Sequence, residues 1–299
     1  MADNNPFPGE NNTGHIWDDD LRELKNPPPR WWTILWWVSI AWCVVYAVLY
    51  PMIPPPLVSD SNKGLLGWTQ IGEYKDGLAE LDTVRSKYES RIKTMSAKEI
   101  LADAELSNYI SHGDGAGAGK VLFGDNCSAC HGSAGQGTVG FPVLADDNWI
   151  WGGSIEKIVE TISNGRGPKA TIPSPGMPAH GATLSLKEIN SLAKYVVGLS
   201  EGKDDPSGKK LFMEKGCVGC HGADGKGLAA LGSVNLTDAI WRFDEEDRLS
   251  SAAYTIRHGV NQMGNPKSRE AVMPTFGSRL SADEVKKLAV YVYKFGGGK

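Results

Sequence analysis

The chain has 299 residues, which at about 100–200 residues per domain is enough for about two domains. Its 31 Lys and Arg residues against 35 Asp and Glu residues give a formal net charge of −4, which excludes the strongly basic surface of a nucleic-acid-binding protein. Charged residues make up 22% and hydrophobic residues 41%, so neither a fully disordered chain nor a protein with many membrane spans is expected.

The N-terminal part of the chain changes abruptly from polar to apolar. Residues 1–30 are polar without an apolar period, so we expect an irregular segment that lacks a core. Residues 31–53 follow, and no charge occurs between Trp31 and Tyr50, a length that spans a hydrocarbon core of about 30 Å as a helix ended by Pro51. A buried core helix rarely stays uncharged over twenty residues, and no small-residue cleavage site of a signal peptide follows. A single transmembrane helix is therefore predicted.

A connector occupies residues 54–116. Ser96 and Glu99 have the spacing of a capping box in front of the apolar Ile100, which predicts a short helix there. The alternating charges around it indicate a solvated helix face.

The remainder of the chain is a repeat, with one copy in residues 117–200 (the first repeat) and one in residues 204–299 (the second repeat). Near its end each copy has a Ser-x-x-Glu capping box, at Ser185 and at Ser281, followed by apolar residues spaced for one buried helix face. Two copies of one small helical domain are therefore expected.

Each repeat contains Cys-x-x-Cys-His, the attachment signature of haem c. Two cysteines one helical turn apart can form thioethers with the two vinyl groups of one porphyrin, which holds the adjacent histidine beneath the iron as an axial ligand. A zinc or redox Cys-x-x-Cys is the alternative, but each repeat offers a single cysteine pair. The sequence thus predicts two covalent haem c groups, at Cys127, Cys130 and His131 and at Cys217, Cys220 and His221.

Glycines follow both motifs at matched positions. Wrapping a chain closely around a flat macrocycle requires turns with positive φ and close backbone approach, which favour glycine. We expect such turns at Gly132, Gly135, Gly137, Gly222, Gly225 and Gly227.

Met177 and Met273 are the candidates for the second axial ligand. Each is followed by proline and lies seven residues before the matched Leu-Ser of the closing helix, whereas Met213 precedes its motif and Met263 lacks the proline. A methionine thioether completes the coordination of a low-spin electron carrier and raises its reduction potential. We expect each methionine to serve the haem of its own repeat, with exchange between the two repeats as the open alternative.

The predicted fold is all-α, with a single N-terminal transmembrane helix followed by two tandem class I cytochrome c domains. Arg22, Lys25 and Arg30 precede the helix and only Lys63 follows it closely, so the positive-inside tendency places the N-terminus in the cytoplasm. Haem c is attached outside the cytoplasm, which independently places both haem domains in the periplasm. We expect a single-pass protein of the bacterial inner membrane.

Several segments resemble the dihaem subunit III of cbb3-type cytochrome c oxidases, the high-affinity bacterial terminal oxidases, and the resemblance covers nearly the whole chain. The most specific match is at the N-terminus, and the matching segments include Thr13-Gly14-His15-Ile16-Trp17-Asp18, Pro29-Arg30-Trp31-Trp32, Gly67-Trp68-Thr69, Met177-Pro178 and Met273-Pro274. The resemblance implies electron transfer from a donor cytochrome c through this subunit to the monohaem subunit II. Subunit I would then reduce oxygen and pump protons.

No catalytic residue is predicted, because we find no nucleophile–base pair and no further metal-ligand cluster in the sequence. Two alternative functions remain. A membrane-anchored dihaem carrier could serve another periplasmic or membrane reductase and would differ only in its partner. A dihaem peroxidase would need an open or histidine-ligated iron with a distal acid–base group, against which the two Met-Pro pairs argue.

Overall fold

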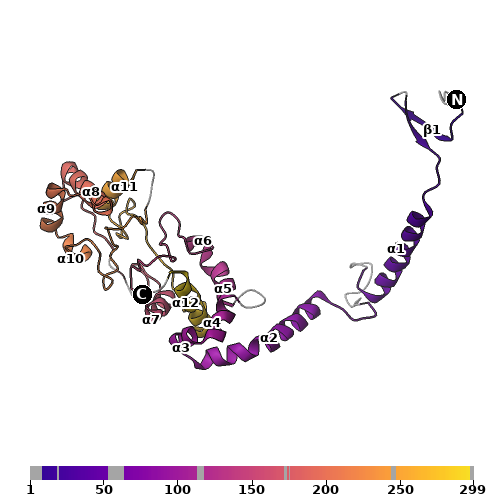
Figure 1. The fold of residues 1–299 in the computed structure, drawn as a ribbon, viewed down its shortest axis with the longest axis horizontal. Helices are drawn as coiled ribbons and strands as arrows, with labels where there is room; N and C mark the ends of the chain where they lie inside the picture. The colour runs from indigo at the N-terminus through magenta and orange to yellow at the C-terminus, as the bar shows by residue number, and fades with distance from the viewer. Residues whose placement is uncertain are drawn as a thin grey trace. The chain divides into compact units, whose positions relative to one another are not determined.

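The computed structural model describes residues 9–18, 20–52, 64–112, 118–171, 174, 176–243 and 247–296. Its described part is mostly helical, and the chain divides into two units, residues 1–85 and 86–299 (Figure 1). The boundary falls inside α2 (Gln70–Thr94). Lys63, used above for the topology, lies outside the described residues.

The N-terminal segment forms a β-hairpin in the first unit. Strands β1 (Asn12–Trp17) and β2 (Leu21–Leu24) are antiparallel, with Trp17 opposite Leu21. The expectation of an irregular segment is wrong here, because a two-stranded ladder is held by backbone hydrogen bonds and needs no apolar alternation. The large apolar side chains of the hairpin, Trp17, Leu21 and Leu24, are exposed.

The predicted apolar helix is α1 (Arg30–Leu49), which ends just before Pro51. Its mean hydropathy is 1.8 and none of its residues is buried. By length and composition it could cross a membrane, and it is the one such helix within the described ranges. Exposed tryptophans such as Trp42, which is 67% exposed, would be covered by lipid in that setting.

The second unit holds the remaining helices. Their bounds are α3 (Ala97–Ala102), α4 (Ala104–Ser111), α5 (Ala118–Asn126), α6 (Ser128–His131), α7 (Ile155–Asn164), α8 (Leu186–Glu201), α9 (Pro206–Glu214), α10 (Val218–His221), α11 (Arg248–His258) and α12 (Ala282–Gly296). The predicted capping boxes are present before α3, α8 and α12, where Ser96, Ser185 and Ser281 each exchange hydrogen bonds with a glutamate three residues later.

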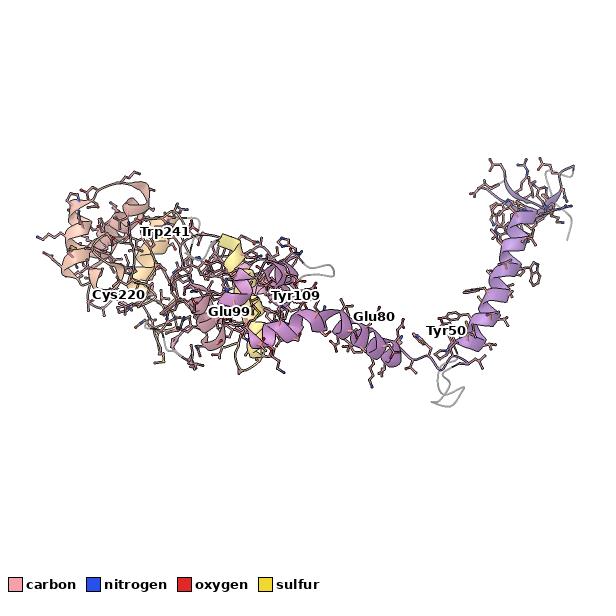
Figure 2. The ribbon with its side chains drawn as sticks, turned by 60° about the horizontal axis from the view of Figure 1, so that its bottom comes forward. Tyr50, Glu80, Glu99, Tyr109, Cys220 and Trp241 are labelled. Carbon is pink, nitrogen blue, oxygen red and sulfur yellow. The ribbon has the colours of Figure 1, made fainter. Side chains whose placement is uncertain are left out.

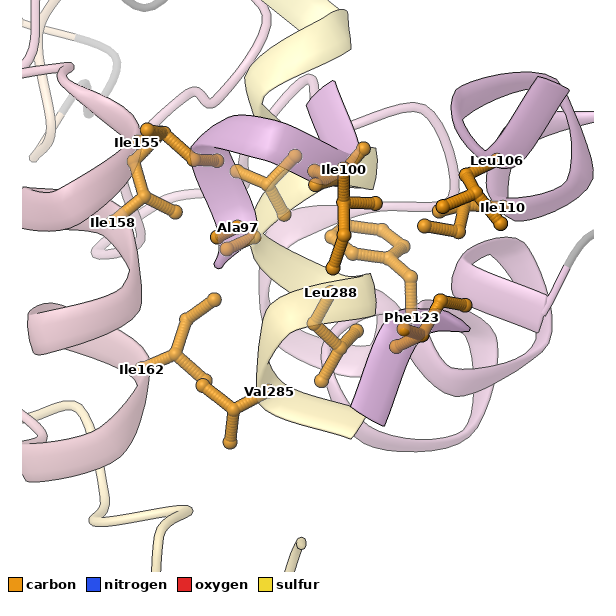
Figure 3. Close-up of a cluster of buried hydrophobic side chains, with 14 of the residues drawn as sticks. Ala97, Ile100, Leu106, Ile110, Phe123, Ile155, Ile158, Ile162, Val285 and Leu288 are labelled. Carbon is orange, nitrogen blue, oxygen red and sulfur yellow. The ribbon is translucent and has the colours of Figure 1, made fainter. Parts of the chain in front are cut away.

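One buried cluster, the first core, joins the connector to the haem repeats. It packs α5 and α7 of the first repeat against α12, the last helix of the second repeat, as Figure 3 shows for Val285 and Leu288. Connector residues such as Ile100 are also fully buried in this cluster. The connector therefore contributes one side to the core, in addition to the solvated helix face that was expected. The buried members are Ile92, Ala97, Ile100, Leu106, Ile110, Phe123, Ile155, Ile158, Ile162, Phe276, Val285, Leu288, Ala289, Val290 and Val292.

A second buried cluster, the second core, has the reciprocal composition. It packs α9 and α11 of the second repeat against α8, the closing helix of the first repeat. Its buried members are Leu184, Ile189, Leu192, Ala193, Tyr195, Val196, Phe212, Ala252 and Ile256. The two repeats therefore exchange their closing helices, and each core takes its last helix from the opposite repeat.

Candidate haem sites

The two Cys-x-x-Cys-His motifs lie on matched short helices. Cys127 is the N-cap residue of α6 and Cys217 that of α10, and each helix ends at its histidine. This single turn places the two cysteines of a motif on one side, as a porphyrin with two vinyl groups requires. Burial raises the pKa of Cys127 to about 11 and also raises that of Cys217. Reactive redox cysteines have lowered values, so the alternative of a thiol redox motif is disfavoured.

Both motif histidines are oriented by a backbone carbonyl. Nδ1 of His131 lies 3.0 Å from the carbonyl oxygen of Pro142, and Nδ1 of His221 lies 3.2 Å from that of Val234. A carbonyl oxygen only accepts, so Nδ1–H donates and Nε2 keeps the lone pair that binds a metal. Burial lowers the pKa of both histidines, which favours the neutral imidazole.

The loop after each motif folds back on its histidine through glycines. All six glycines that were expected to have a positive φ do so, with values between +70° and +78°. They are Gly132, Gly135 and Gly137 of the first repeat and Gly222, Gly225 and Gly227 of the second. The N–H groups of Gly137 and Gly227 donate to the carbonyl oxygens of His131 and His221. The turn prediction is therefore confirmed.

The two candidate methionines are exchanged between the repeats. Met273 forms a two-way backbone bridge with Arg166, at 2.7 and 2.9 Å, and packs against the first core together with Cys127. Met177 accepts a backbone hydrogen bond from Val260 at 2.9 Å and packs against the second core together with Cys217. This packing favours the alternative of exchange between the repeats over the expected pairing within each repeat, because each methionine lies next to an exchanged closing helix.

Met213 and Met263 are set apart from these sites by exposure. Their exposed fractions are 49% and 81%, whereas Met177 and Met273 are partly buried. Met177 and Met273 are therefore the methionines that the structure brings to the motifs.

One continuous cavity of about 1140 Å³ connects the two sites. Its walls include both motifs and both exchanged methionines, and they are mainly apolar, as a porphyrin requires. Cys220 and Trp241, two of the lining residues, are labelled in Figure 2.

Two buried donors in the cavity wall fit a haem. Trp149 packs against the first core and Trp241 against the second, and both side chains line the cavity. Neither indole Nε1 has a hydrogen-bond partner among the described residues. A buried N–H usually has an acceptor, and a haem propionate is a suitable one. Sequence reasoning missed this pair, although Leu-x-Asp-x-x-Trp stands at matched positions, from Leu144 and from Leu236.

Known protein families match both the N-terminal segment and the two repeats. Residues 9–55 match the N-terminal domain of cytochrome oxidase-cbb3, FixP, and residues 116–200 and 207–295 each match cytochrome c. The cbb3-type cytochrome c oxidase subunit FixP of Bradyrhizobium diazoefficiens is 37% identical over 100% of both chains. FixP of Rhizobium meliloti is 36% identical over 97% of this chain and 96% of its own, and CcoP of Azospirillum sp. (strain B510) is 38% identical over 97% of each. The chain therefore belongs to the FixP/CcoP family of cbb3-type cytochrome c oxidase subunits.

Proposed function

We propose that the chain accepts electrons from a donor cytochrome c and passes them to the monohaem subunit II of the oxidase, whose subunit I reduces oxygen to water. As a FixP/CcoP subunit it carries two covalent haem c groups and is an electron-transfer component of an oxidoreductase complex. The observation that supports the relay most directly is the single cavity that both motifs line. Two cofactors that share one continuous cavity would have no separate protein core between them, which favours electron exchange through the chain.

His131 and Met273 would hold the iron of one haem, and His221 and Met177 would hold that of the other. The support is the packing of Met273 with Cys127 in the first core and of Met177 with Cys217 in the second. Haem iron, when bound, carries one electron at a time between its ferric and ferrous forms. A histidine and a methionine at each iron would leave no open position for a substrate, which disfavours the peroxidase alternative.

The proposed topology has the N-terminal hairpin in the cytoplasm, α1 across the inner membrane and the second unit in the periplasm. It is supported by the basic residues Arg22, Lys25 and Arg30 on the N-terminal side of α1. It is also supported by haem c being attached outside the cytoplasm. In this arrangement the motif loops are accessible to a periplasmic donor.

The exchanged ligation can be tested in chains that carry one haem. With Cys217 and Cys220 replaced by alanine, only the first motif attaches haem. In that chain Met273→Leu should abolish the near-infrared methionine–iron absorption and Met177→Leu should preserve it. The opposite pattern would establish pairing within each repeat. The reciprocal chain, with Cys127 and Cys130 replaced, provides the matched control.

The oxidase assignment can be tested by purifying the tagged chain in mild detergent. Haem b that co-purifies with haem c, together with cyanide-sensitive oxygen uptake, is the expected result. A lone dihaem c spectrum without oxygen uptake, under conditions in which the complex survives, would favour a carrier for another reductase.

A further inference from the structure

Arg242 of the second repeat lies against the haem loop of the first repeat. Its Nε donates to the carbonyl oxygen of Gly140 at 2.9 Å, and the N–H of Gly140 donates to the Arg242 carbonyl oxygen at 2.6 Å. Gly140 belongs to the loop that runs from His131 to Pro142, the residue whose carbonyl orients that histidine. The second repeat therefore places a cation beside the first motif.

The guanidinium of Arg242 has no carboxylate partner within the described part of the chain. Only its Nε–H is hydrogen-bonded there, although the side chain is partly buried in the cavity wall. Arg166, the other arginine in this wall with a buried side chain, instead pairs with Glu160 at 2.9 Å. Desolvation lowers the pKa of Arg242 to about 10, so it remains charged at neutral pH. A partly buried cation without a counter-charge favours an anion in the cavity.

The charge acts on the first site rather than the second. The side chain of Arg242 is hydrogen-bonded to the loop that follows the first motif, and within the described ranges no hydrogen bond joins its guanidinium to the loop of the second motif. Trp241, immediately before it, packs into the second core, so two consecutive side chains serve opposite sites. The matched position in the first repeat is the apolar Ile150, which makes the two sites electrostatically unequal.

We propose that Arg242 pairs with a propionate of the haem attached at Cys127 and Cys130 and raises the reduction potential of that haem. A guanidinium binds a carboxylate through two parallel hydrogen bonds, a geometry that lysine cannot reproduce. A positive charge near an iron favours the ferrous form, because the ferric form carries one more positive charge. The inference requires the two haem c groups and does not depend on which methionine binds which iron.

The test is a spectroelectrochemical titration of the full-length dihaem chain, fitted as two one-electron components. Trp149→Phe and Trp241→Phe identify the components, since these side chains pack against the first and second cores with Cys127 and Cys217. Arg242→Gln should shift the ferric–ferrous equilibrium of the Trp149-sensitive component about tenfold towards ferric, which is about 59 mV for one electron. Arg242→Lys should recover part of that shift.

The control is Arg257→Gln, which removes an equal charge from an exposed position in the same repeat and should leave both components unchanged. A shift confined to the Trp241-sensitive component would overturn the proposal, as would equal shifts of both components or none. If the Arg242→Gln chain does not attach haem, the test rests on Arg242→Lys alone. A reduction potential of the Trp149-sensitive component equal to that of the parent chain would then contradict the bidentate pairing. The titration uses the isolated chain, so its two potentials do not depend on the oxidase partners. A failure of this proposal can therefore be distinguished from a failure of the proposed electron path.

Discussion

The loops that close over the haem sites depend on single glycines. Gly227 has φ of +78°, and a Cβ there would be closer to the carbonyl oxygen of Ser233 than any normal contact allows. Gly219 lies between the cysteines of the same motif, has open space around it, and corresponds to Ala129 of the first repeat. A side chain is therefore excluded at Gly227 and tolerated at Gly219.

Gly227→Ala should destabilise the holoprotein by about 1–3 kcal/mol, because alanine is strained at positive φ and meets backbone atoms. Gly219→Ala should leave the stability nearly unchanged. Thermal unfolding of both variants, followed by the haem absorption, provides the comparison. Equal melting temperatures for the two variants would show that the loop does not require the left-handed conformation.

At the scale of elements, the exchange of α8 and α12 determines which parts of the chain stabilise each other. Leu192 on α8 and Leu288 on α12 are matched in the repeat and almost completely buried, yet they lie in opposite cores. Stability within the second unit is therefore shared between the repeats.

Leu192→Ala should cost about 2–5 kcal/mol and increase amide hydrogen exchange in α9 and α11, which belong to the other repeat. Leu288→Ala should have the same size of effect on α5 and α7 instead. Hydrogen exchange followed by mass spectrometry of the two variants distinguishes them. Increased exchange in α5 and α7 on replacing Leu192 would contradict the exchange of helices.

The capping box of α8 makes part of the stability dependent on pH. Hydrogen bonds from Ser185, with a contribution from Lys215, lower the pKa of Glu188 to about 2. An unfolded glutamate titrates near ~4.3, so this stabilisation is complete above that value and is lost as the pH falls through about 2.

Glu188→Gln should therefore lower the melting temperature at pH 7, and the difference from the parent chain should disappear between about pH 4 and pH 2. Thermal unfolding in a series of buffers measures it. Glu156→Gln, an exposed glutamate in the first turn of α7, is the control. A difference that grew as the pH fell would have the wrong sign for this mechanism.

The sequence predicted the features that depend on neighbouring residues, but it did not predict the packing between distant segments. The capping boxes, the end of α1 before Pro51 and the positive-φ glycines follow from neighbouring residues, and all were predicted correctly. The exchange was not predicted, because Leu192 and Leu288 present the same apolar face and either helix suits either core. The hairpin was missed because its strands carry no alternating apolar pattern that would have revealed them.

At the scale of the whole molecule, the part of the connector from Ser86 onwards belongs to the haem-bearing unit. Ile92, Ile100 and Leu106 are fully buried, and Lys287 of α12 holds both carboxylate oxygens of Glu89 at 2.9 Å. The last part of α2 and the helices α3 and α4 are therefore required to cover α12.

A fragment of residues 86–299 should bind two haems and unfold at the temperature of the full-length chain. A fragment of residues 113–299 should unfold at a lower temperature, because it exposes the apolar surface of α12 that the connector covers. Thermal unfolding of the two fragments in the same buffer gives the comparison. Equal midpoints would mean that the connector is only a spacer.

The long separation along the chain between the first motif and α12 has a consequence for biogenesis. The first core cannot close until a segment more than 150 residues beyond its cysteines, from Val285 to Val292, has been made. Contacts between such distant segments form late, because loop closure precedes any gain from packing. The thiols of Cys127 and Cys130 thus stay accessible for haem attachment until α12, the helix that completes the core around them, has been made.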